Sequence, residues 1–506
     1  ASRHAAAGTL AGALRKLNAR HARQPADAAL TEELRAYFRD DVGLLSEVMK
    51  RDLSPWLEGL PAREPGSSGH ARRPVPGQAS VGSIGQAPGA TAQHRQSTMS
   101  RQPKPHASDA IPGEPMPRKT IRRKADLAIH GAPPALATPL HVGRPNVVDR
   151  DDFLRRMAEV LDNQWLTNNG PMVQELERRI AMRLGVRHCV AVCNGTTALE
   201  IAIRALGLKG EVILPSWTFI ATAHALSWQG ITPVFADIDP VTHAVDPAAV
   251  RRLITPRTTG IIGVHLWGRA APVDELQAIA DEHGLKLMFD AAHAFGSTYK
   301  GLPIGVHGAC EAFSFHATKA FNTMEGGAVT TNDDELAETM RLTRNFGFKG
   351  YDNVVCPGIN GKMVEACAAM GLSNLDGFDG VVAANRRGHA AYREALAGVP
   401  GIAVLDYDPA ERSNYHYVVV EVDERCAASR DEIVAALHAE NVLARKYFWP
   451  GCHRMQPYSD FPACEGQALA QTEAVADKVI VLPNGPSVSD AAIRAVGEVL
   501  SVLARK

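Results

Sequence analysis

One lysine stands in a setting that would make it a nucleophile. Lys319 lies in a polar turn four residues after Phe315, which ends an aromatic segment typical of a buried strand, and Gly326 and Gly327 open the next apolar segment. A lysine held between two buried strands loses solvation, which lowers the pKa of its amine toward neutrality. Such an amine is suited to Schiff-base chemistry. The alternative is an ordinary surface lysine in a loop.

Two stretches upstream supply the other groups that such chemistry needs. One is a buried-looking strand that ends at Asp290, and the other is a strand that runs into the turn Asn194–Thr197 and then a helix. At the start of a helix, backbone N–H groups and the helix dipole favour an anion. A carboxylate, an anion cradle and a lysine are what pyridoxal phosphate requires from a protein. By itself, however, the Asn-Gly-Thr turn is a common strand–helix connection.

Together these stretches resemble those of the DegT/DnrJ/EryC1/StrS sugar aminotransferases, a family of fold-type I pyridoxal-phosphate enzymes. The resemblance covers residues 137–506 and is greatest for members that aminate the C4 ketone of dTDP-4-dehydro-6-deoxyglucose. It implies a pyridoxal 5′-phosphate-dependent aminotransferase that moves an amino group from glutamate, or glutamine, to a keto carbon of a nucleotide-linked deoxysugar. The expected carbon is C4, and the expected setting is antibiotic or polysaccharide biosynthesis.

The resemblance assigns the chemical roles to two residues. Lys319 is expected to bind the cofactor and to shuttle a proton, which an arginine could not do because guanidinium keeps its proton. Asp290 is expected to hold the ring nitrogen of the cofactor protonated. Where the family often has an aromatic residue followed by arginine, this chain has Gly361 and Lys362. The contacts of Lys362 therefore stay open.

The resemblance also implies contacts to each part of the cofactor. For the phosphate they are Gly195, Thr196, Thr197 and Ser314, for the ring hydroxyl His293, and for the ring face Phe219, with Trp217 as the alternative. Asn360 corresponds to an asparagine that family members donate to the phosphate of a neighbouring subunit. A homodimer with shared active sites is therefore expected, with L-glutamate and an NDP-sugar, dTDP-linked, as substrates.

The pattern around these residues predicts an α/β fold. From residue 188 to 331, strand and helix patterns alternate, which is typical of a mostly parallel sheet covered by helices. The candidate strands are 188–193, 211–214, 231–236, 260–265, 285–290, 311–315 and 327–331. We expect a fold-type I enzyme with a PLP-binding large domain, residues 136–375, built on a mostly parallel seven-stranded sheet.

After about residue 376 the pattern changes to that of a smaller α+β domain, residues 376–506. A strand is expected within 417–422 and another within 442–448. Ser429 to Glu432 form a capping box that would begin a helix, and a last helix is expected to begin at Ser489.

The first 135 residues differ from the rest. Residues 1–58 are expected to form a small helical segment, and residues 15–57 resemble the C-terminal end of PAPS-dependent sulfotransferases without that family's nucleotide-binding loop. An unrelated helical hairpin is the alternative. Residues 59–135 are rich in Pro, Gly, Ser and Arg without apolar periodicity, which predicts a disordered linker. We interpret its basic cluster, 118–124, as a solvated charge run, with a nucleic-acid or membrane contact as the alternative.

The composition narrows the class of protein further. The chain has 506 residues, enough for two or three domains, and its net charge of -1 gives no general attraction to nucleic acid or anionic membranes. It has no apolar run that could span a bilayer and no apolar segment of a secretory signal at its start. Its eight cysteines form no C-x-x-C pair, so no metal site is expected. Such cysteine use fits a reducing cytoplasm.

Three other functions agree with parts of the pattern. An enzyme of the same group could aminate another ketone, such as a ketocyclitol. A deoxysugar dehydratase on the same fold would have histidine in place of the lysine, so Lys319 argues against it. A non-catalytic regulatory protein on the PLP fold would not need Lys319, Asp290 and Ser314 together. The sequence leaves the exact sugar and the stereochemistry open.

Overall fold

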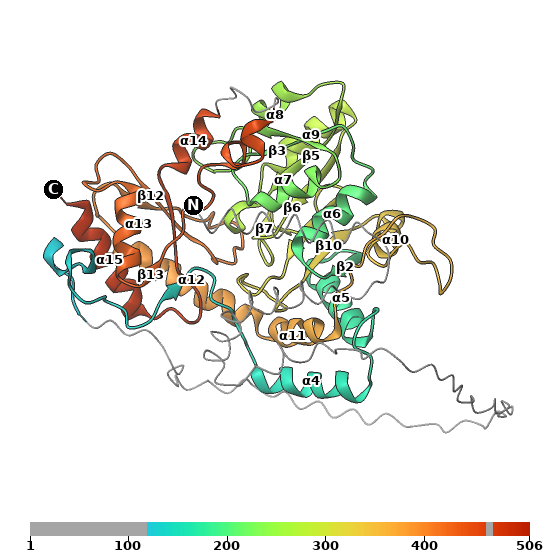
Figure 1. Cartoon of the computed structure of the whole chain (residues 1–506), viewed down its shortest axis with the longest axis horizontal. Coiled ribbons are helices and arrows are strands. Elements are labelled where there is room, and N and C mark those ends of the chain that lie inside the picture. The colour runs from blue at the N-terminus through green and yellow to red at the C-terminus, as the bar shows by residue number, and fades with distance from the viewer. Residues whose placement is uncertain (1–118, 462–468, 506) are drawn as a thin grey trace, which may run out of the picture. The chain divides into compact units, whose positions relative to one another are not determined.

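The computed structural model describes residues 119–461 and 469–505. All of them belong to Lys104–Lys506, one of the two units into which the chain divides. The helical segment expected in residues 1–58, with its sulfotransferase-like part, and residues 59–118 of the expected linker lie outside the described residues. Figure 1 labels the helices and strands.

A seven-stranded sheet organises the first part of the described chain, in the order β2-β10-β9-β6-β5-β3-β4. Its strands are β2 (His188–Val192), β3 (Glu211–Pro215), β4 (Thr232–Ala236), β5 (Thr258–Val264), β6 (Lys286–Asp290), β9 (Cys310–Ser314) and β10 (Gly327–Thr331). Within this sheet only β10 runs antiparallel to its neighbours. The fold-type I class and the mostly parallel sheet are confirmed, and each strand begins within two residues of its predicted start.

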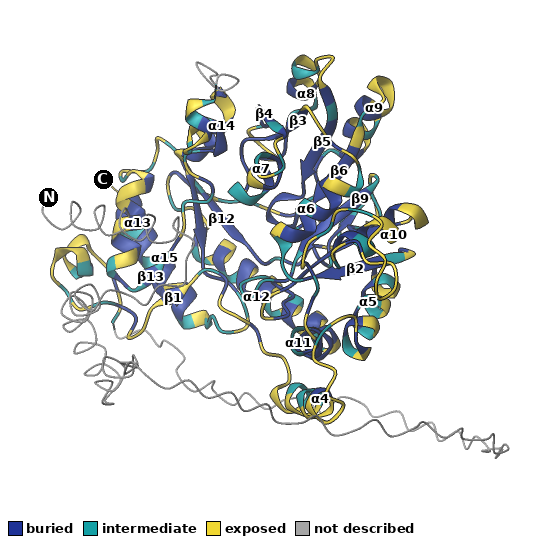
Figure 2. Ribbon diagram, turned by 45° about the vertical axis from the view of Figure 1, so that its right-hand side comes forward, coloured by how far each residue is buried: buried dark blue, intermediate teal, exposed yellow. Residues whose placement is uncertain are grey.

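Helices cover both faces of this sheet, which is why its strands are apolar almost throughout. One face packs against α6 (Gly195–Ala205), α7 (Ile220–Ser227) and α10 (Asp334–Thr343), and the other against α5 (Pro171–Leu184), α8 (Pro247–Leu253), α9 (Val273–His283) and α11 (Glu365–Asp376). Because successive side chains of a strand alternate between faces, Met288 packs in the first layer and Phe289 in the second. Figure 2 shows the buried strands between helices whose outer faces are exposed.

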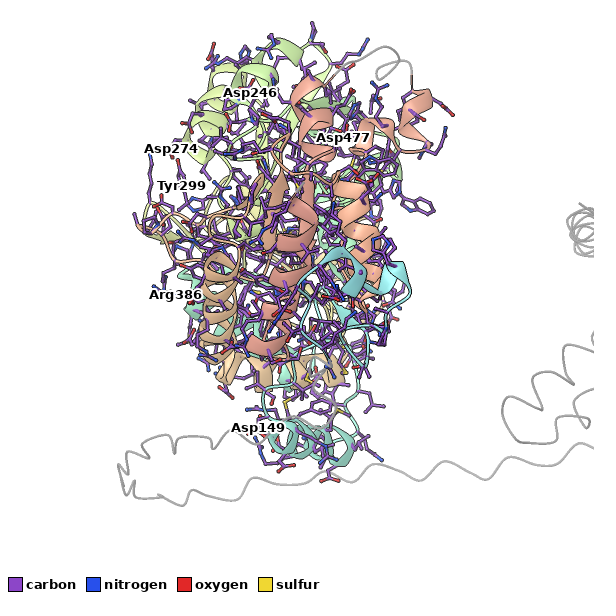
Figure 3. The ribbon with its side chains drawn as sticks, turned by 90° about the vertical axis from the view of Figure 1, so that its left-hand side faces the viewer. Asp149, Asp246, Asp274, Tyr299, Arg386 and Asp477 are labelled. Carbon is purple, nitrogen blue, oxygen red and sulfur yellow. The ribbon has the colours of Figure 1, made fainter. Side chains whose placement is uncertain are left out.

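N-capping residues determine where several helices begin. Asp149 caps α4 (Arg150–Asp162), because its side chain accepts the N–H groups of Asp151 and Asp152, and Asp246 caps α8 in the same way. These two caps lie near opposite ends of the view in Figure 3. The apolar side chains of α4 are mostly open to solvent: Val160 is buried, but Leu161 is 59% exposed.

A second sheet organises the C-terminal part. Antiparallel strands β11 (Ile402–Val404), β12 (Val418–Val422) and β14 (Val479–Leu482) share a core with α12 (Phe378–Ala395), α13 (Arg430–Ala439) and α15 (Asp490–Ala504). The capping box at Ser429 is present, and α15 follows Ser489 as predicted. The smaller strand pairs are β1 (Leu140–His141) with β13 (Val442–Leu443), and β7 (Thr298–Tyr299) with β8 (Leu302–Pro303).

The strand predicted over 442–448 is shorter than expected. Only Val442 and Leu443 form a strand, and they pair with β1. Arg445 makes a single antiparallel bridge to Val481 of the three-stranded sheet. The chain then turns, because the N–H of Trp449 donates to the carbonyl of Lys446 and that of Gly451 to the carbonyl of Phe448.

The linker prediction is wrong for residues 119–135. Ile121 and Leu127 are 3% and 0% exposed and belong to the core of the C-terminal part. The buried carboxylate of Glu440 accepts the N–H groups of Ala128 and Ala135, each at 2.6 Å. Two short 3-10 turns, η1 (Lys124–Asp126) and η2 (Ala128–His130), connect these contacts. The apolar residues are too few and too unevenly spaced to give a periodic signal.

The described residues contain neither a helix that could span a membrane nor a cluster that could bind a metal ion. None of their helices is both long enough and apolar enough to cross a membrane. Nor do three or more of their His, Cys, Asp and Glu side chains gather as they would around a metal ion.

Candidate active site

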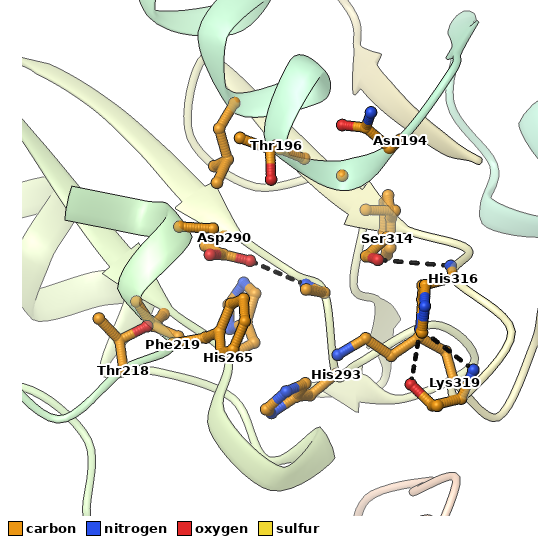
Figure 4. A pocket seen from close by; sticks show the side chains of 18 of the residues that line it. Asn194, Thr196, Thr218, Phe219, His265, Asp290, His293, Ser314, His316 and Lys319 are labelled. Atoms are coloured by element: carbon orange, nitrogen blue, oxygen red, sulfur yellow. Dashed lines mark hydrogen bonds between the residues drawn. The ribbon is translucent and has the colours of Figure 1, made fainter. Parts of the chain in front are cut away.

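A cavity of about 410 Å³ opens at the edge of the large sheet where the parallel strands end. In open α/β sheets this is the edge at which ligands bind. Seven of the nine residues predicted from the sequence line it, namely Gly195, Thr196, Phe219, Asp290, His293, Ser314 and Lys319. Figure 4 labels all of these except Gly195, and their side chains surround one space. Tyr417, Arg445, Tyr447 and Phe448 complete the wall from the C-terminal part.

Lys319 lies in the turn between β9 and β10 and extends into the cavity toward His293 (Figure 4). Its Nζ lies 3.5 Å from the hydroxyl of Tyr417. Burial lowers the pKa of the amine to about 8, against the opposing attraction of the Asp290 carboxylate. At pH 7 about a tenth of such amines are neutral. Lys319 therefore has the burial and the lowered pKa that the sequence predicted for it.

Asp290 ends β6, buried at the base of the cavity. One carboxylate oxygen accepts the Thr222 hydroxyl at 2.8 Å and the other accepts the N–H of Ala292 at 3.0 Å. Burial raises the pKa of this carboxyl, while the two hydrogen bonds and Lys319 act to lower it. Among the described residues Asp290 has no ion-pair partner within 4 Å. Its position suits a protonated ring nitrogen.

The anion cradle forms where β2 meets α6. Asn194 caps this helix, because its side chain accepts the N–H of Thr197 at 2.8 Å. A Cβ atom at Gly195 would lie 2.6 Å from the Cβ of Ser314, so only glycine permits this close approach. Thr197, unlike Thr196, does not line the cavity: its hydroxyl lies 3.4 Å from the sulfur of Cys193.

His293 and Phe219 line the aromatic side of the cavity. The ring of His293 stacks on Trp267 at 5.9 Å, and its Nδ1 accepts the backbone N–H of Trp267 at 3.4 Å. Burial and the nearby Lys319 hold the pKa of His293 well below its usual value, so the imidazole is neutral with its proton on Nε2. Phe219 is 54% exposed and lines the cavity, whereas Trp217, the alternative, is buried and lies outside the lining.

Asn360 lies outside the cavity of its own chain. It is exposed, and its side-chain oxygen accepts the Lys362 amine at 2.6 Å. Its backbone pairs with that of Asn345. Of the predicted phosphate contacts, Asn360 and Thr197 therefore do not line the cavity of a single chain.

The sequence did not point to several residues of the site, among them Thr222, Tyr417, Arg445 and Tyr447. Thr222, which orients Asp290, is a polar position in the mostly apolar helix α7, and that was its only signal. Tyr417, Arg445 and Tyr447 come from the C-terminal part, just before β12 and after β13, and no local motif marks them. His316 also lines the cavity, and its Nε2 lies 3.4 Å from a carboxylate oxygen of Glu325.

The fold and the site define a fold-type I aminotransferase. The chain belongs to the DegT/DnrJ/EryC1/StrS aminotransferase family, whose model matches residues 148–501. It is a pyridoxal-phosphate-dependent sugar aminotransferase.

Relatives of known name cover most of the chain. It is 37% identical over 344 residues to a dTDP-4-amino-4,6-dideoxy-D-glucose transaminase of Escherichia coli, spanning 68% of this chain and 92% of the relative. It is 37% identical over 313 residues to the GDP-perosamine synthase of Caulobacter vibrioides, spanning 60% and 83%. The solved structure of DesI in the presence of its TDP-sugar product is 51% identical, with a TM-score of 0.72, covering 75% of this chain and 96% of that one.

The cavity fits the cofactor of this family. The Asp290 carboxylate has no ion-pair partner among the described residues, the Lys319 amine has a lowered pKa, and Gly195 leaves the start of α6 open to a phosphate. Bound there, pyridoxal phosphate supplies an electron sink next to the reacting amino carbon.

Proposed function

We propose that this enzyme moves an amino group from L-glutamate, or glutamine, to carbon C4 of a dTDP-linked keto-6-deoxysugar. The observation that carries the proposal is the 37% identity, over 92% of its length, to a relative named for a dTDP-linked 4-amino-4,6-dideoxyglucose. The DesI structure, named for a TDP-sugar product, supports the same nucleotide. The GDP-perosamine synthase makes a GDP-linked sugar the second candidate.

Lys319 is the base of the proposed reaction. Its neutral amine takes the proton from the amino carbon of the donor and returns a proton to the corresponding carbon of the acceptor. Asp290, held by Thr222, keeps a proton on the ring nitrogen of the cofactor. Gly195, Thr196 and Ser314 hold the phosphate, and Phe219 covers the ring.

Arg445 is the cation available to an anionic substrate. Among the described residues that line the cavity, only Lys319 and Arg445 are lysine or arginine. The guanidinium of Arg445 lies over the ring of Tyr447 at 4.7 Å and makes no ion pair within the described part of the chain. Glutamate carries two carboxylates and a dTDP-sugar carries a diphosphate, so both bring negative charge that a guanidinium binds well.

A division of the chain follows from this assignment. Residues 136–375 form the proposed PLP-binding domain and residues 376–506 the proposed smaller domain. Tyr417 and Arg445 then belong to the smaller domain, while Lys319 and Asp290 belong to the larger one. The substrate would bind between groups supplied by both.

A homodimer would complete the site. Exposed apolar side chains gather around α4 and along the segment that contains Asn360, namely Leu154, Leu161, Trp165, Leu166, Phe346, Phe348, Val354 and Ile359. Clusters of this kind mark protein interfaces. In the proposed dimer, Asn360 on the surface of one copy contacts the phosphate bound in the neighbouring copy.

The experiment is a panel of acceptors with isotopically labelled glutamate, read by mass spectrometry. The panel contains the 3-keto and 4-keto forms of dTDP-, UDP- and GDP-linked deoxysugars, with a ketocyclitol as the control. Labelled nitrogen in the 4-keto dTDP-sugar product is expected. Label only in the ketocyclitol, or in none of the acceptors, would contradict the proposal.

A further inference from the structure

Three polar side chains outside the cavity are joined by hydrogen bonds. Oγ of Ser216 lies 2.6 Å from Nδ1 of His453, and Nε2 of His453 lies 3.1 Å from a carboxylate oxygen of Glu473. Ser216 follows β3, His453 belongs to the 3-10 turn η4 (Cys452–Arg454), and Glu473 belongs to α14 (Ala470–Ala476). These hydrogen bonds therefore connect the loop after β3 to the C-terminal part.

These residue types also form the catalytic triad of serine hydrolases. Here such chemistry is excluded by access, because Ser216 and His453 are 0% and 1% exposed and neither lines the cavity. No substrate can reach the serine oxygen. The three side chains hold structure in place.

The turn η4 holds the loop at further points. The N–H of Cys452 donates to the carbonyl of Ser216 at 2.9 Å, and its thiol donates to the carbonyl of Thr218 at 3.3 Å. The N–H of His453 also donates to the Ser216 hydroxyl oxygen, at 3.1 Å. Hydrogen bonds from η4 thus fix the loop at Ser216 and at Thr218.

The inner side of the same loop faces the cofactor groups. The Thr218 hydroxyl lies 3.0 Å from that of Thr222, which donates to Asp290 at 2.8 Å. The next residue, Phe219, lines the cavity. A displacement of the loop would therefore disturb both the hydroxyl groups that support the Asp290 carboxylate and the Phe219 side chain that lines the cavity.

We propose that His453 is a positioning residue for the cofactor: it fixes residues 216–219 so that Thr222 aims the Asp290 carboxylate and Phe219 faces the ring. The inference rests on the cofactor roles given to Asp290 and Phe219 under the proposed function. His453 serves as a neutral imidazole, accepting the Ser216 hydroxyl at Nδ1 and donating from Nε2 to Glu473. Burial lowers the pKa of His453, which favours that form.

The test uses the full chain with bound pyridoxal phosphate and two readouts that need no substrate. Visible circular dichroism reports how the cofactor is held, and the loss of visible absorbance after dilution reports how fast it leaves. In both His453→Leu and Ser216→Ala, which break the same buried hydrogen bond, we expect weaker ellipticity per bound cofactor. We also expect cofactor loss to be about tenfold faster.

Two further variants make the test specific. His453→Gln keeps an acceptor and a donor, and it should restore part of the ellipticity. Arg454→Gln removes another partner of Glu473, at 2.6 Å, on a side chain with no hydrogen bond to the loop, and it should match the parent. If His453→Leu fails to fold, Ser216→Ala decides alone.

Parent-like ellipticity and cofactor retention in Ser216→Ala and in folded His453→Leu would overturn the inference. An equal loss in Arg454→Gln would also overturn it, since the effect would then belong to Glu473 in general. A parent that holds the cofactor but transfers no amine would instead contradict the proposed function alone.

Discussion

The Lys319 amine lies 3.5 Å from the hydroxyl of Tyr417, and the two residues reach the cavity from different sheets. Lys319 follows β9 of the seven-stranded sheet, whereas Tyr417 precedes β12 of the three-stranded sheet. Burial raises the pKa of the tyrosine, so its hydroxyl is neutral and can hold the lysine nitrogen near the reacting carbon.

Removal of that hydroxyl should slow the reaction without releasing the cofactor. In Tyr417→Phe the ring contact with His293, at 4.5 Å, is kept and only the contact with the amine is lost. We expect kcat to fall about fivefold, the scale of one hydrogen bond. Steady-state kinetics and visible absorbance measure the two quantities, and loss of the cofactor in this variant would contradict the prediction.

The pH dependence should report the lowered pKa of Lys319. A base must be neutral to take a proton, so kcat should rise as pH increases and level off above the pKa of about 8. Below that pH the slope should approach about tenfold per unit. A pH–rate profile checks this, and a kcat that falls as pH approaches 8 from below would have the wrong sign.

Asp290→Asn should keep the cofactor and lose most of the activity. The amide retains the shape of the side chain and one acceptor oxygen, but not the charge that holds the ring nitrogen protonated. A loss of about 10²- to 10³-fold in kcat is expected on the scale of electrostatic stabilisation. Normal turnover in Asp290→Asn would remove the role given to Asp290.

Thr222→Val tests the support of the same carboxylate. The substitution keeps the volume and deletes the hydroxyl that donates to Asp290 at 2.8 Å. We expect about a tenfold loss in kcat. A loss as large as that of Asp290→Asn would show that Thr222 does more than orient the carboxylate.

Residues 119–135 should contribute measurably to stability. Compared with a chain that begins at residue 119, a chain that begins at 136 loses the buried side chains of Ile121 and Leu127 and leaves Glu440 without three of its partners. Each apolar side chain contributes about 1.5–3 kcal/mol, and an unpaired buried acceptor costs about 1–3 kcal/mol. Thermal unfolding of the two chains should differ by several degrees, and equal midpoints would show that these contacts stabilise little.

Much of the large sheet could be predicted because each strand carries a local signal. Strands such as β2 and β6 are short apolar runs bounded by polar or glycine turns, and residues at their ends, such as Asp290 and Ser314, are placed by the strand itself. Tyr417 and Arg445 could not be placed at the cavity, nor His453 beside the loop after β3, because only long-range packing brings them there. Ile121 and Leu127 are buried by the same long-range contacts, without any periodicity.

The central claim is that the Lys319 nitrogen binds the cofactor aldehyde. Borohydride treatment of the protein with bound pyridoxal phosphate fixes that bond, and peptide mass spectrometry locates it. The predicted result is a single modified peptide that carries the label on Lys319, and loss of the visible absorbance in Lys319→Ala. A label on another lysine, or no label after added pyridoxal phosphate, would contradict the account.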